Sequence, residues 1–471
     1  MKVAIAGASG FVGRALVEKL REHHEVIALS RSPSRQEPPR AGGKPVEWRG
    51  CDLFSLLDIE KGLEGAEVAV YLVHSMRPSA HLSQGRFEDF DLIVADNFVR
   101  AAAKHQLRQI IYLGGLLPES RATLSRHLRS RLEVEEIFRA SRVPETILRA
   151  SMIVGAQGSS FQMMWRLVKR LPVMLCPRWT RTPTQPVALT DVVQALSFCV
   201  GREECLNQVY DVAGPDVLSY RQMMAVLARV LGKKRRFWTV PFLTPRLSVL
   251  WIRLITGAPK ELVKPLVAGL RLRLTAREEK ILRLPGHRFL SFQEAAAAAV
   301  KEIPPGDPHA FQRPSVPRHE ARSVQRLPLP PGWTAEHVAQ AYLRWLPRSN
   351  SAFLMAKVEG RRVSLCWRWP EIPLLVLEYS PERSTPHRQL FYVRGGRLSR
   401  QGPRGRLEFR EIPGGRAVIT ALHNFSPSLP WVIYRWTQAW VHLATMRLYR
   451  VYLLRRIRKK SKPWTTLAEG S

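Results

Sequence analysis

Three glycines recur at three-residue intervals in the segment KVAIAGASGFVGRALVEKL, which begins at Lys2. Gly7, Gly10 and Gly13 stand between an apolar run typical of a strand and an amphipathic run typical of a helix. A dinucleotide site needs glycine at such places, because the chain must turn sharply, approach a pyrophosphate closely and pack its helix against the strand. The segment therefore predicts a dinucleotide-binding turn, with the phosphates at the N-terminus of the helix.

The residue that ends the second strand-like run discriminates between the two nicotinamide dinucleotides. An acidic residue there would accept the ribose 2′-hydroxyl of NAD. The sequence has ALSRSPSR instead, with Arg31 at the tip, Arg35 behind it and no acidic residue before Glu37. Arginine suits a 2′-phosphate, so the sequence favours NADP, with NAD as the alternative. The other interpretation of Arg31 is an ordinary surface arginine in an arginine-rich chain.

The elements that position these residues follow a regular alternation. Strand-like runs at 2–7, 25–30, 45–48, 67–73, 108–115 and 145–150 are separated by helical patterns. Strands that alternate with helices of this length predict an α/β fold with a doubly wound parallel sheet of the Rossmann type, over residues 1–151. The spacing G-x-x-G-x-x-G departs from the commoner G-x-G-x-x-G, but its place at the first strand–helix junction makes the prediction strong.

Two further groups follow strands of this sheet, at the edge where the ligand crevice lies. Asp52 and Leu53 come after the third strand, where such folds contact the adenine ring. Val73, His74 and Ser75 end the fourth strand. His74 has the chemistry of a proton donor, although a lone histidine at a strand end is more often a loop residue or a cofactor contact.

The rest of the chain divides by composition. Residues 152–302 read as an elaboration on the substrate side of the sheet, and residues 303–332, dense in proline and charge, as a linker. Residues 333–471 predict an α+β domain with an antiparallel sheet and one long terminal helix from about 431 to 460. We expect one of two roles for a set of methionines and tryptophans in this region: they form an adaptable apolar lining of a substrate pocket, or they belong to the hydrophobic core. The set is Met163, Met164, Trp165 and Trp179.

The net charge and the cysteine content limit the binding partners and the cellular compartment that can be expected for this protein. The 471-residue chain has a formal net charge of +34, which raises nucleic acid or an anionic membrane as a partner. No known nucleic-acid motif accompanies the charge, so the sequence argues against nucleic acid and for a solvated basic surface. Five scattered cysteines indicate neither a zinc site nor a disulfide framework, and the chain begins without a signal-peptide pattern. We expect a cytoplasmic protein.

The motifs AGASGFVG, RGCDL, YLVHS, IIYLGG, ETILRASMIVG, QPVALTDVV and VYDVAGPDVLSY occur in this order over about the first 300 residues. In this order they resemble the atypical and extended short-chain dehydrogenase/reductase superfamily, specifically its NmrA-like NAD(P)-binding members, followed by a C-terminal domain of unknown function. The resemblance implies that Arg31 binds the 2′-phosphate and that Asp52 with Leu53 contacts the adenine. It also implies a pyrophosphate cradle made of Gly7, Ser9, Gly10, Phe11 and Val12.

The sequence departs from that superfamily where the reaction would occur. Active members commonly use a Tyr-x-x-x-Lys pair on the helix after the fifth strand and a serine at the end of that strand. Here His127 stands in place of the tyrosine and Arg131 in place of the lysine, while Gly114 and Gly115 stand where the serine is expected.

The substituted residues leave two interpretations open. His127, with an ordinary pKa near 6.5, is a candidate proton donor, and Arg131 is a candidate ligand of a ribose hydroxyl. The alternative is that both are exposed residues of a basic helix, because i,i+4 spacing puts them on one face in any case.

The terminal helix combines tryptophans and tyrosines with a basic end, and no acidic residue occurs between Glu411 and Glu469. It predicts either a peripheral anchor on the anionic inner face of a membrane or a helix packed on the sheet with a solvated tail.

Two hypotheses for the whole protein follow from these observations. One is an NADP-dependent oxidoreductase of an apolar carbonyl or conjugated substrate. The other is a non-catalytic NADPH-binding sensor or membrane-associated scaffold.

Overall fold

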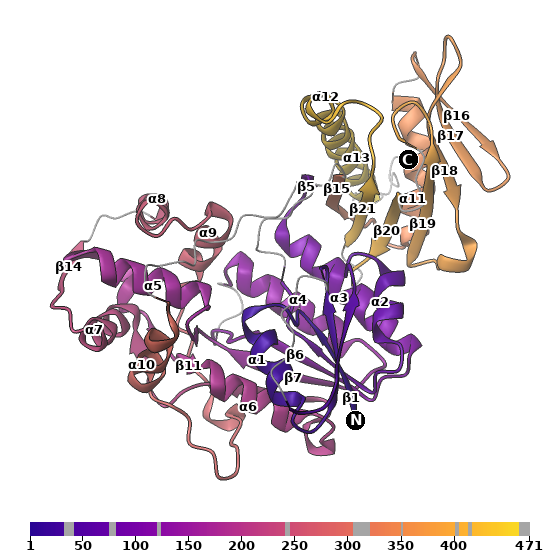
Figure 1. Cartoon of the computed structure of the whole chain (residues 1–471). Coiled ribbons are helices and arrows are strands. Elements are labelled where there is room, and N and C mark those ends of the chain that lie inside the picture. The colour runs from indigo at the N-terminus through magenta and orange to yellow at the C-terminus, as the bar shows by residue number, and fades with distance from the viewer. Residues whose placement is uncertain are drawn as a thin grey trace, which may run out of the picture. The chain divides into compact units, whose positions relative to one another are not determined.

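The computed structural model describes residues 1–32, 42–74, 82–119, 124–240, 245–304, 321–349, 352–400, 405–412 and 417–460. Ser75, Arg35 and residues 305–320 of the expected linker lie outside these ranges. The chain forms two compact units (Figure 1). The first comprises Met1–Pro78 with Asp91–Arg313, and the second comprises Ser79–Phe90 with Pro314–Ser471.

A parallel seven-stranded sheet forms the centre of the first unit, in the order β12-β7-β6-β4-β1-β2-β3. The strand order reverses between β1 and β4, which places the ligand crevice at their carboxyl ends. This confirms the doubly wound Rossmann-type sheet. The strands are β1 (Lys2–Ala6), β2 (Glu25–Ser30), β3 (Val46–Gly50), β4 (Val68–Tyr71), β6 (Gln109–Gly115), β7 (Glu145–Ala150) and β12 (Gln208–Val212).

Helices cover both faces of this sheet (Figure 1). On one face α1 (Phe11–Leu20) and α6 (Leu189–Cys199) bury leucines and valines against the apolar side chains of β1, β4 and β7. On the other face α3 (Phe87–Lys104) and α4 (Arg126–Arg139) set Phe98 and Phe138 at 5.1 Å from the ring of Tyr71. α2 (Leu56–Leu63) connects β3 to β4 and begins with a Ser55 cap.

The substrate-side elaboration is built from short strand pairs and helices. β12 belongs to this segment in sequence but pairs with β7 at the edge of the main sheet. The boundary expected at residue 151 therefore does not separate the main sheet from the elaboration. The elements are β8 (Ile153–Val154), α5 (Ser159–Arg170), β9 (Val173–Pro177), η3 (Arg178–Arg181), β10 (Pro183–Thr184), β11 (Val187–Ala188), η4 (Glu203–Cys205), β13 (Leu218–Ser219), α7 (Tyr220–Val230), β14 (Arg236–Val240), α8 (Pro245–Thr256), α9 (Lys260–Gly269), η5 (Glu278–Lys280) and α10 (Phe292–Glu302).

The second unit is an α+β domain with a sheet in the order β16-β17-β18-β19-β20-β21-β15-β5. Every neighbouring pair is antiparallel except β15 with β5, which is parallel. This confirms the antiparallel sheet expected of residues 333–471. Its elements are β5 (Leu82–Gln84), β15 (Ala321–Pro328), α11 (Ala335–Ser349), β16 (Leu354–Glu359), β17 (Arg362–Trp367), β18 (Ile372–Tyr379), η6 (Pro381–Arg383), β19 (Arg388–Gly395), β20 (Arg406–Glu411), β21 (Ala417–Phe425), α12 (Trp431–Trp436) and α13 (Gln438–Lys460).

Two expectations for this unit need correction. Residues 321–328, which the sequence pattern assigns to the linker, form β15. Their backbone pairs with β21, and their apolar side chains enter the core. The terminal helix is interrupted at Thr437 and forms α12 and α13. α13 packs inward, and its Tyr449 hydroxyl donates to the Val338 carbonyl of α11 at 2.6 Å. Among the described residues, no helix is both long enough and apolar enough to span a membrane.

Candidate functional site

The glycine turn joins β1 to α1 with the geometry that a pyrophosphate requires. Gly7 has a φ of 90°, which other residues rarely adopt, and its carbonyl accepts a hydrogen bond from the Gly10 amide at 2.9 Å. A Cβ at Gly13 would lie 2.1 Å from the Gly7 oxygen, so only glycine allows this approach of helix to strand. Gly10 caps α1 without a side chain, leaving the amides of the first turn to a ligand.

The remaining residues of the turn divide between solvent and packing. Ser9 is exposed, while Phe11 and Val12 are half-buried. Phe11 lies against the segment after β8, because added Cβ atoms at Gly155 and Gly158 would come within 2.7 and 3.1 Å of its ring. The backbone of the turn therefore has the geometry that fits a dinucleotide. Its Phe11 contacts the loop that leads into α5.

Three predicted contacts lie at the carboxyl ends of the neighbouring strands. Arg31 is exposed directly after β2. Asp52 is half-buried after β3, and its carboxylate accepts the Phe54 amide at 3.2 Å. The buried Asn97 of α3 donates to the carbonyls of Leu53 and Phe54, each at 3.2 Å, and so fixes this loop.

The end of β4 lies directly beside the turn. An added Cβ at Gly7 would come within 3.2 Å of the Val73 side chain. Val73 is half-buried and His74 is exposed. The structure thus brings Gly7 and Val73 together, while Ser75 lies outside the described residues.

His127 lies in the first turn of α4 and lines a cavity. Burial, with a smaller contribution from the nearby Arg131 charge, lowers the pKa of His127 to about 3. Among the described residues, its buried Nδ1 atom has no hydrogen-bond partner. The ordinary pKa near 6.5 therefore does not apply to His127 in the folded protein, because burial beside a cation favours the neutral imidazole. The alternative of an exposed His127 is wrong.

Arg131 is buried and does not line the cavity. Its guanidinium lies 3.1 Å from the buried carboxylate of Asp91, which also accepts the Ser130 hydroxyl at 2.7 Å. Although burial works to lower it, Asp91 and the neighbouring tyrosines hold the pKa of Arg131 above its ordinary value. The interpretation of Arg131 as an exposed residue of a basic helix is wrong, since the side chain belongs to a buried ion pair.

The two glycines at the end of β6 have different surroundings. Gly114 faces the ring of Tyr112, with 3.0 Å between an added Cβ and the nearest ring carbon. Gly115 faces Leu128 of α4 and lines the cavity beside His127. A serine at Gly115 would therefore point toward α4.

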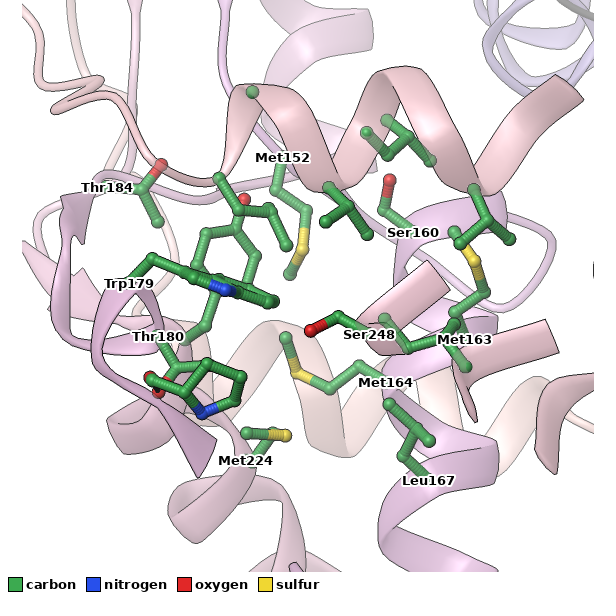
Figure 2. A pocket seen from close by; sticks show the side chains of 18 of the residues that line it. Met152, Ser160, Met163, Met164, Leu167, Trp179, Thr180, Thr184, Met224 and Ser248 are labelled. Atoms are coloured by element: carbon green, nitrogen blue, oxygen red, sulfur yellow. Dashed lines mark hydrogen bonds between the residues drawn. The ribbon is translucent and has the colours of Figure 1, made fainter. Parts of the chain in front are cut away.

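The cavity has a volume of about 560 Å³ and is mostly apolar (Figure 2). Three of the four predicted lining residues, Met163, Met164 and Trp179, are confirmed as lining, whereas Trp165 packs in the core. Sequence reasoning missed the contributions of more distant segments, which have no motif of their own. These include Met152, Thr184, Tyr220, Met224, Ser248 and Leu270.

A few polar groups interrupt the apolar lining. Among the described residues, the indole N–H of Trp179 has no hydrogen-bond partner, and neither has the hydroxyl of Thr184, whose side chain is 1% exposed and lies beside Tyr220. In Figure 2, Thr184 and Trp179 lie on the same side of the cavity. Burial raises the pKa values of Cys176 and Tyr220, so both stay protonated. Buried polar atoms without partners in an apolar cavity are the expected contacts of a ligand oxygen.

The glycine turn and the cavity share one connecting segment. Gly155 and Gly158 contact Phe11 of the turn, and α5, which follows at once, carries Ser160, Met163, Met164 and Leu167 into the cavity. Gly115, Ala150 and Met152 lie at the ends of β6 and β7, at the same sheet edge as the turn. A ligand of the turn and a ligand of the cavity would therefore meet near His127.

Comparison with known proteins identifies the first of these ligands. Residues 7–166 match the model of a family described as NAD(P)H-binding. This part of the chain is an NAD(P)H-binding domain. The prediction of an NAD(P)-binding domain of the Rossmann type is confirmed for this part of the chain.

The NAD(P)H-binding domain also has curated relatives. The chain is 32% identical over 114 residues to the auxiliary protein GraX of Staphylococcus aureus, a match that covers 24% of this chain and 36% of that protein. The chain is 26% identical over 235 residues to the (4-alkanoyl-5-oxo-2,5-dihydrofuran-3-yl)methyl phosphate reductase of Streptomyces griseus, covering 50% of this chain and 76% of that enzyme. The chain thus spans about a third of GraX and three quarters of the reductase.

Solved structures resemble the first unit in fold. A nucleoside-diphosphate-sugar epimerase from Staphylococcus aureus matches 63% of this chain and 100% of its own, with 14% identity and a TM-score of 0.50. An NADPH-dependent quinone oxidoreductase from Escherichia coli, solved with NADPH, matches 63% of this chain and 99% of its own, with 16% identity and a TM-score of 0.50.

Proposed function

We propose that this protein is an NADPH-dependent reductase of bulky apolar carbonyl or conjugated compounds. The observation that carries the proposal is the continuity between the glycine turn and the cavity, in which one segment contacts Phe11 and then lines the apolar space. The names of two similar proteins, an NADPH-dependent quinone oxidoreductase and a phosphate-ester reductase, support the same class of reaction.

The preference for NADPH rests on Arg31. Its exposed guanidinium follows β2, where a ribose 2′-phosphate would lie if the dinucleotide extends from the turn along the sheet edge. Arginine binds phosphate in a forked geometry and keeps its charge at any working pH. NAD remains the alternative cofactor, because the turn itself binds the pyrophosphate common to both.

The dinucleotide supplies a hydride when it is bound. The chain then has to orient the substrate oxygen and exclude water. His127 is neutral, so it contributes an N–H hydrogen bond to that oxygen. The hydride goes to the substrate carbon, and the proton that completes the alcohol comes from solvent. Thr184 and Trp179 offer further donors deeper in the cavity, and the methionines cover the apolar part of the substrate.

The test is NADPH oxidation by the purified full-length protein, followed by absorbance against a panel of aromatic ketones and quinones. We expect turnover, and a loss of roughly 10–100-fold in kcat/KM for His127→Leu, the range typical of one preorganised donor. The affinity for NADPH should stay unchanged, and His127→Gln should restore part of the rate. The absence of oxidation with every compound, in protein shown to bind NADPH, would refute the proposal.

A second candidate is a non-catalytic NADPH sensor or membrane-associated scaffold. The burial of Arg131 in an ion pair favours it, because the residue in the lysine position then has no access to a nicotinamide ribose. It predicts tight NADPH binding with no turnover by any member of the panel.

A further inference from the structure

The cavity opens to the surface through a rim of leucines. Leu175, Leu247, Leu250 and Leu254 all line the cavity, yet they are 40%, 53%, 49% and 74% exposed. These side chains line the pocket and are also exposed to solvent, so they mark the mouth of the cavity. An exposed apolar patch of this kind on a soluble fold usually contacts another apolar surface.

Three of these leucines form a stripe on α8. Leu247, Leu250 and Leu254 are spaced by three and four residues, so they lie on one face of the helix. The opposite face is buried, since Val249 and Ile252 pack against α5 and α9. α8 is therefore apolar on both faces, and a helix of this type is normally covered on both.

The two helices that pack against α8 expose basic residues. Lys260 and Lys264 are exposed on α9, and Lys169 and Arg170 are exposed at the end of α5, which also contacts α8. In the sequence, Glu261 is the only acidic residue between Asp216 and Glu278. An exposed apolar stripe on a helix whose packing partners expose lysine and arginine is complementary to the acyl boundary and head groups of an anionic bilayer.

We propose that α8 rests in the interface of an anionic lipid bilayer, so that the cavity receives a membrane-resident lipid with a carbonyl head and a long apolar chain. Such a substrate can pass from the acyl region past Leu254 and Leu250 without crossing water. Its carbonyl head would reach His127, with Thr184 and Trp179 as further donors, and its chain would remain at the leucine rim. The choice of substrate rests on the proposed reductase function, but the membrane contact does not.

The first experiment measures binding of the full-length protein to vesicles by flotation. Vesicles of phosphatidylcholine with an equal part of phosphatidylglycerol are compared with pure phosphatidylcholine. The inference predicts binding to the anionic vesicles that weakens with salt, and a loss of about tenfold or more in the doubly substituted Leu250→Glu, Leu254→Glu protein. Leu57→Glu, which changes an exposed leucine of α2, is the matched control and should bind as the unsubstituted protein does.

The second experiment measures NADPH oxidation with two probes. One is a quinone with a long polyisoprenoid chain embedded in the vesicles, and the other is its short-chain analogue dissolved in water. We expect the double substitution to slow the embedded substrate at least about tenfold more than the dissolved one, because it removes the contact that delivers the lipid.

The outcomes separate this inference from the proposed function. Vesicle binding that survives in the Leu250→Glu, Leu254→Glu protein overturns the inference, as does binding lost only when Trp436 and Trp440 of the second unit are changed to serine. Self-association that disappears in the same double variant, without vesicle binding, makes the stripe a contact between copies and also overturns it. Vesicle binding that depends on α8, with no oxidation of either quinone, refutes the reductase function and supports the membrane contact.

Discussion

The glycine turn and helix α4 both face the carboxyl edge of the same sheet, but they act through different parts of the chain. The turn acts through its backbone: Gly7 and Gly13 allow a close approach because they have no side chains, and the first turn of α1 has no side-chain cap. α4 would act through its side chains, and its two candidate functional residues have different surroundings. His127 borders the cavity, while Arg131 is paired with Asp91.

This difference explains why one region follows its family pattern and the other does not. A backbone cradle is specified by residue types that nothing else can replace. The environment of a side chain depends on groups distant in sequence, such as Asp91, that no local motif includes. Five measurements would test this contrast.

The largest effect is expected for Arg131→Met. The substitution leaves the Asp91 carboxylate buried without its cation, which costs about 3–5 kcal/mol in similar cases. The unfolding transition of the first unit in urea, followed by circular dichroism of the whole chain, measures the loss.

The partner substitution provides the control for this prediction. Asp91→Leu combined with Arg131→Met removes both charges and should recover most of the lost stability. If Arg131→Met instead folds with unchanged stability and loses NADPH affinity, the arginine is a cofactor ligand and the contrast between the two regions disappears.

Gly13→Ala should weaken NADPH binding by about 100-fold, or roughly 2.7 kcal/mol. Its Cβ would lie 2.1 Å from the Gly7 carbonyl oxygen, so α1 must move away from the pyrophosphate site. Fluorescence titration with NADPH measures the change. Gly269→Ala is the matched control, because its Cβ meets no atom of the described residues within 4 Å. Equal affinities in the two variants would show that the turn does not hold the dinucleotide.

Arg31→Glu should weaken NADPH by about tenfold or more and leave NADH nearly unchanged, because only the 2′-phosphate is repelled. Parallel titrations with both dinucleotides measure the ratio. Arg108→Glu makes the same change of charge at the amino edge of the sheet, directly before β6, and should alter neither affinity. Equal losses for both dinucleotides in Arg31→Glu would remove the assignment to NADP.

The smallest effect concerns the pH dependence of stability. The pKa of His127 is about 3 in the folded protein and near 6.5 when unfolded, so between these values the unfolded state binds more protons. The contribution of His127 to stability is therefore present above pH 6.5 and is lost as the pH falls toward 3. Replacement by asparagine should make the melting temperature of the first unit fall less between pH 7 and pH 5. His23→Asn, at an exposed position, should not.

The low pKa of His127 also predicts how the reaction rate depends on pH. With a pKa of about 3, His127 produces no inflection in kcat between pH 5 and pH 8. An inflection in this range that disappears in His127→Gln would show that the imidazole carries a proton in the working enzyme.

Most of the first unit could be predicted from local patterns. The alternation of strands and helices determines the parallel sheet, and its order follows from the usual handedness of such connections. The entry of β12 into this sheet could not be predicted, because Gln208–Val212 resembles any short strand of the elaboration. β5 and β15 were missed in the second unit for a related reason. Three residues are too few to form a pattern, and prolines and charges obscured the strand at 321–328.

The cavity was predictable only in part. Met163, Met164 and Trp179 stood out by type, but Thr184, Met224 and Ser248 come from segments with no local signal. Their importance lies in their meeting around one space, which depends on how α5, α7, α8 and β10 pack together.

The sequence by itself determined that a dinucleotide is bound, since steric exclusion at Gly7 and Gly13 is a property of residue type and order. The tertiary structure alone decided what the substituted residues of α4 become. Burial keeps His127 neutral at the cavity, and a carboxylate from α3 pairs with Arg131. The physical reason is that desolvation and charge pairing depend on neighbours brought together by folding, whereas a backbone turn depends only on its own few residues.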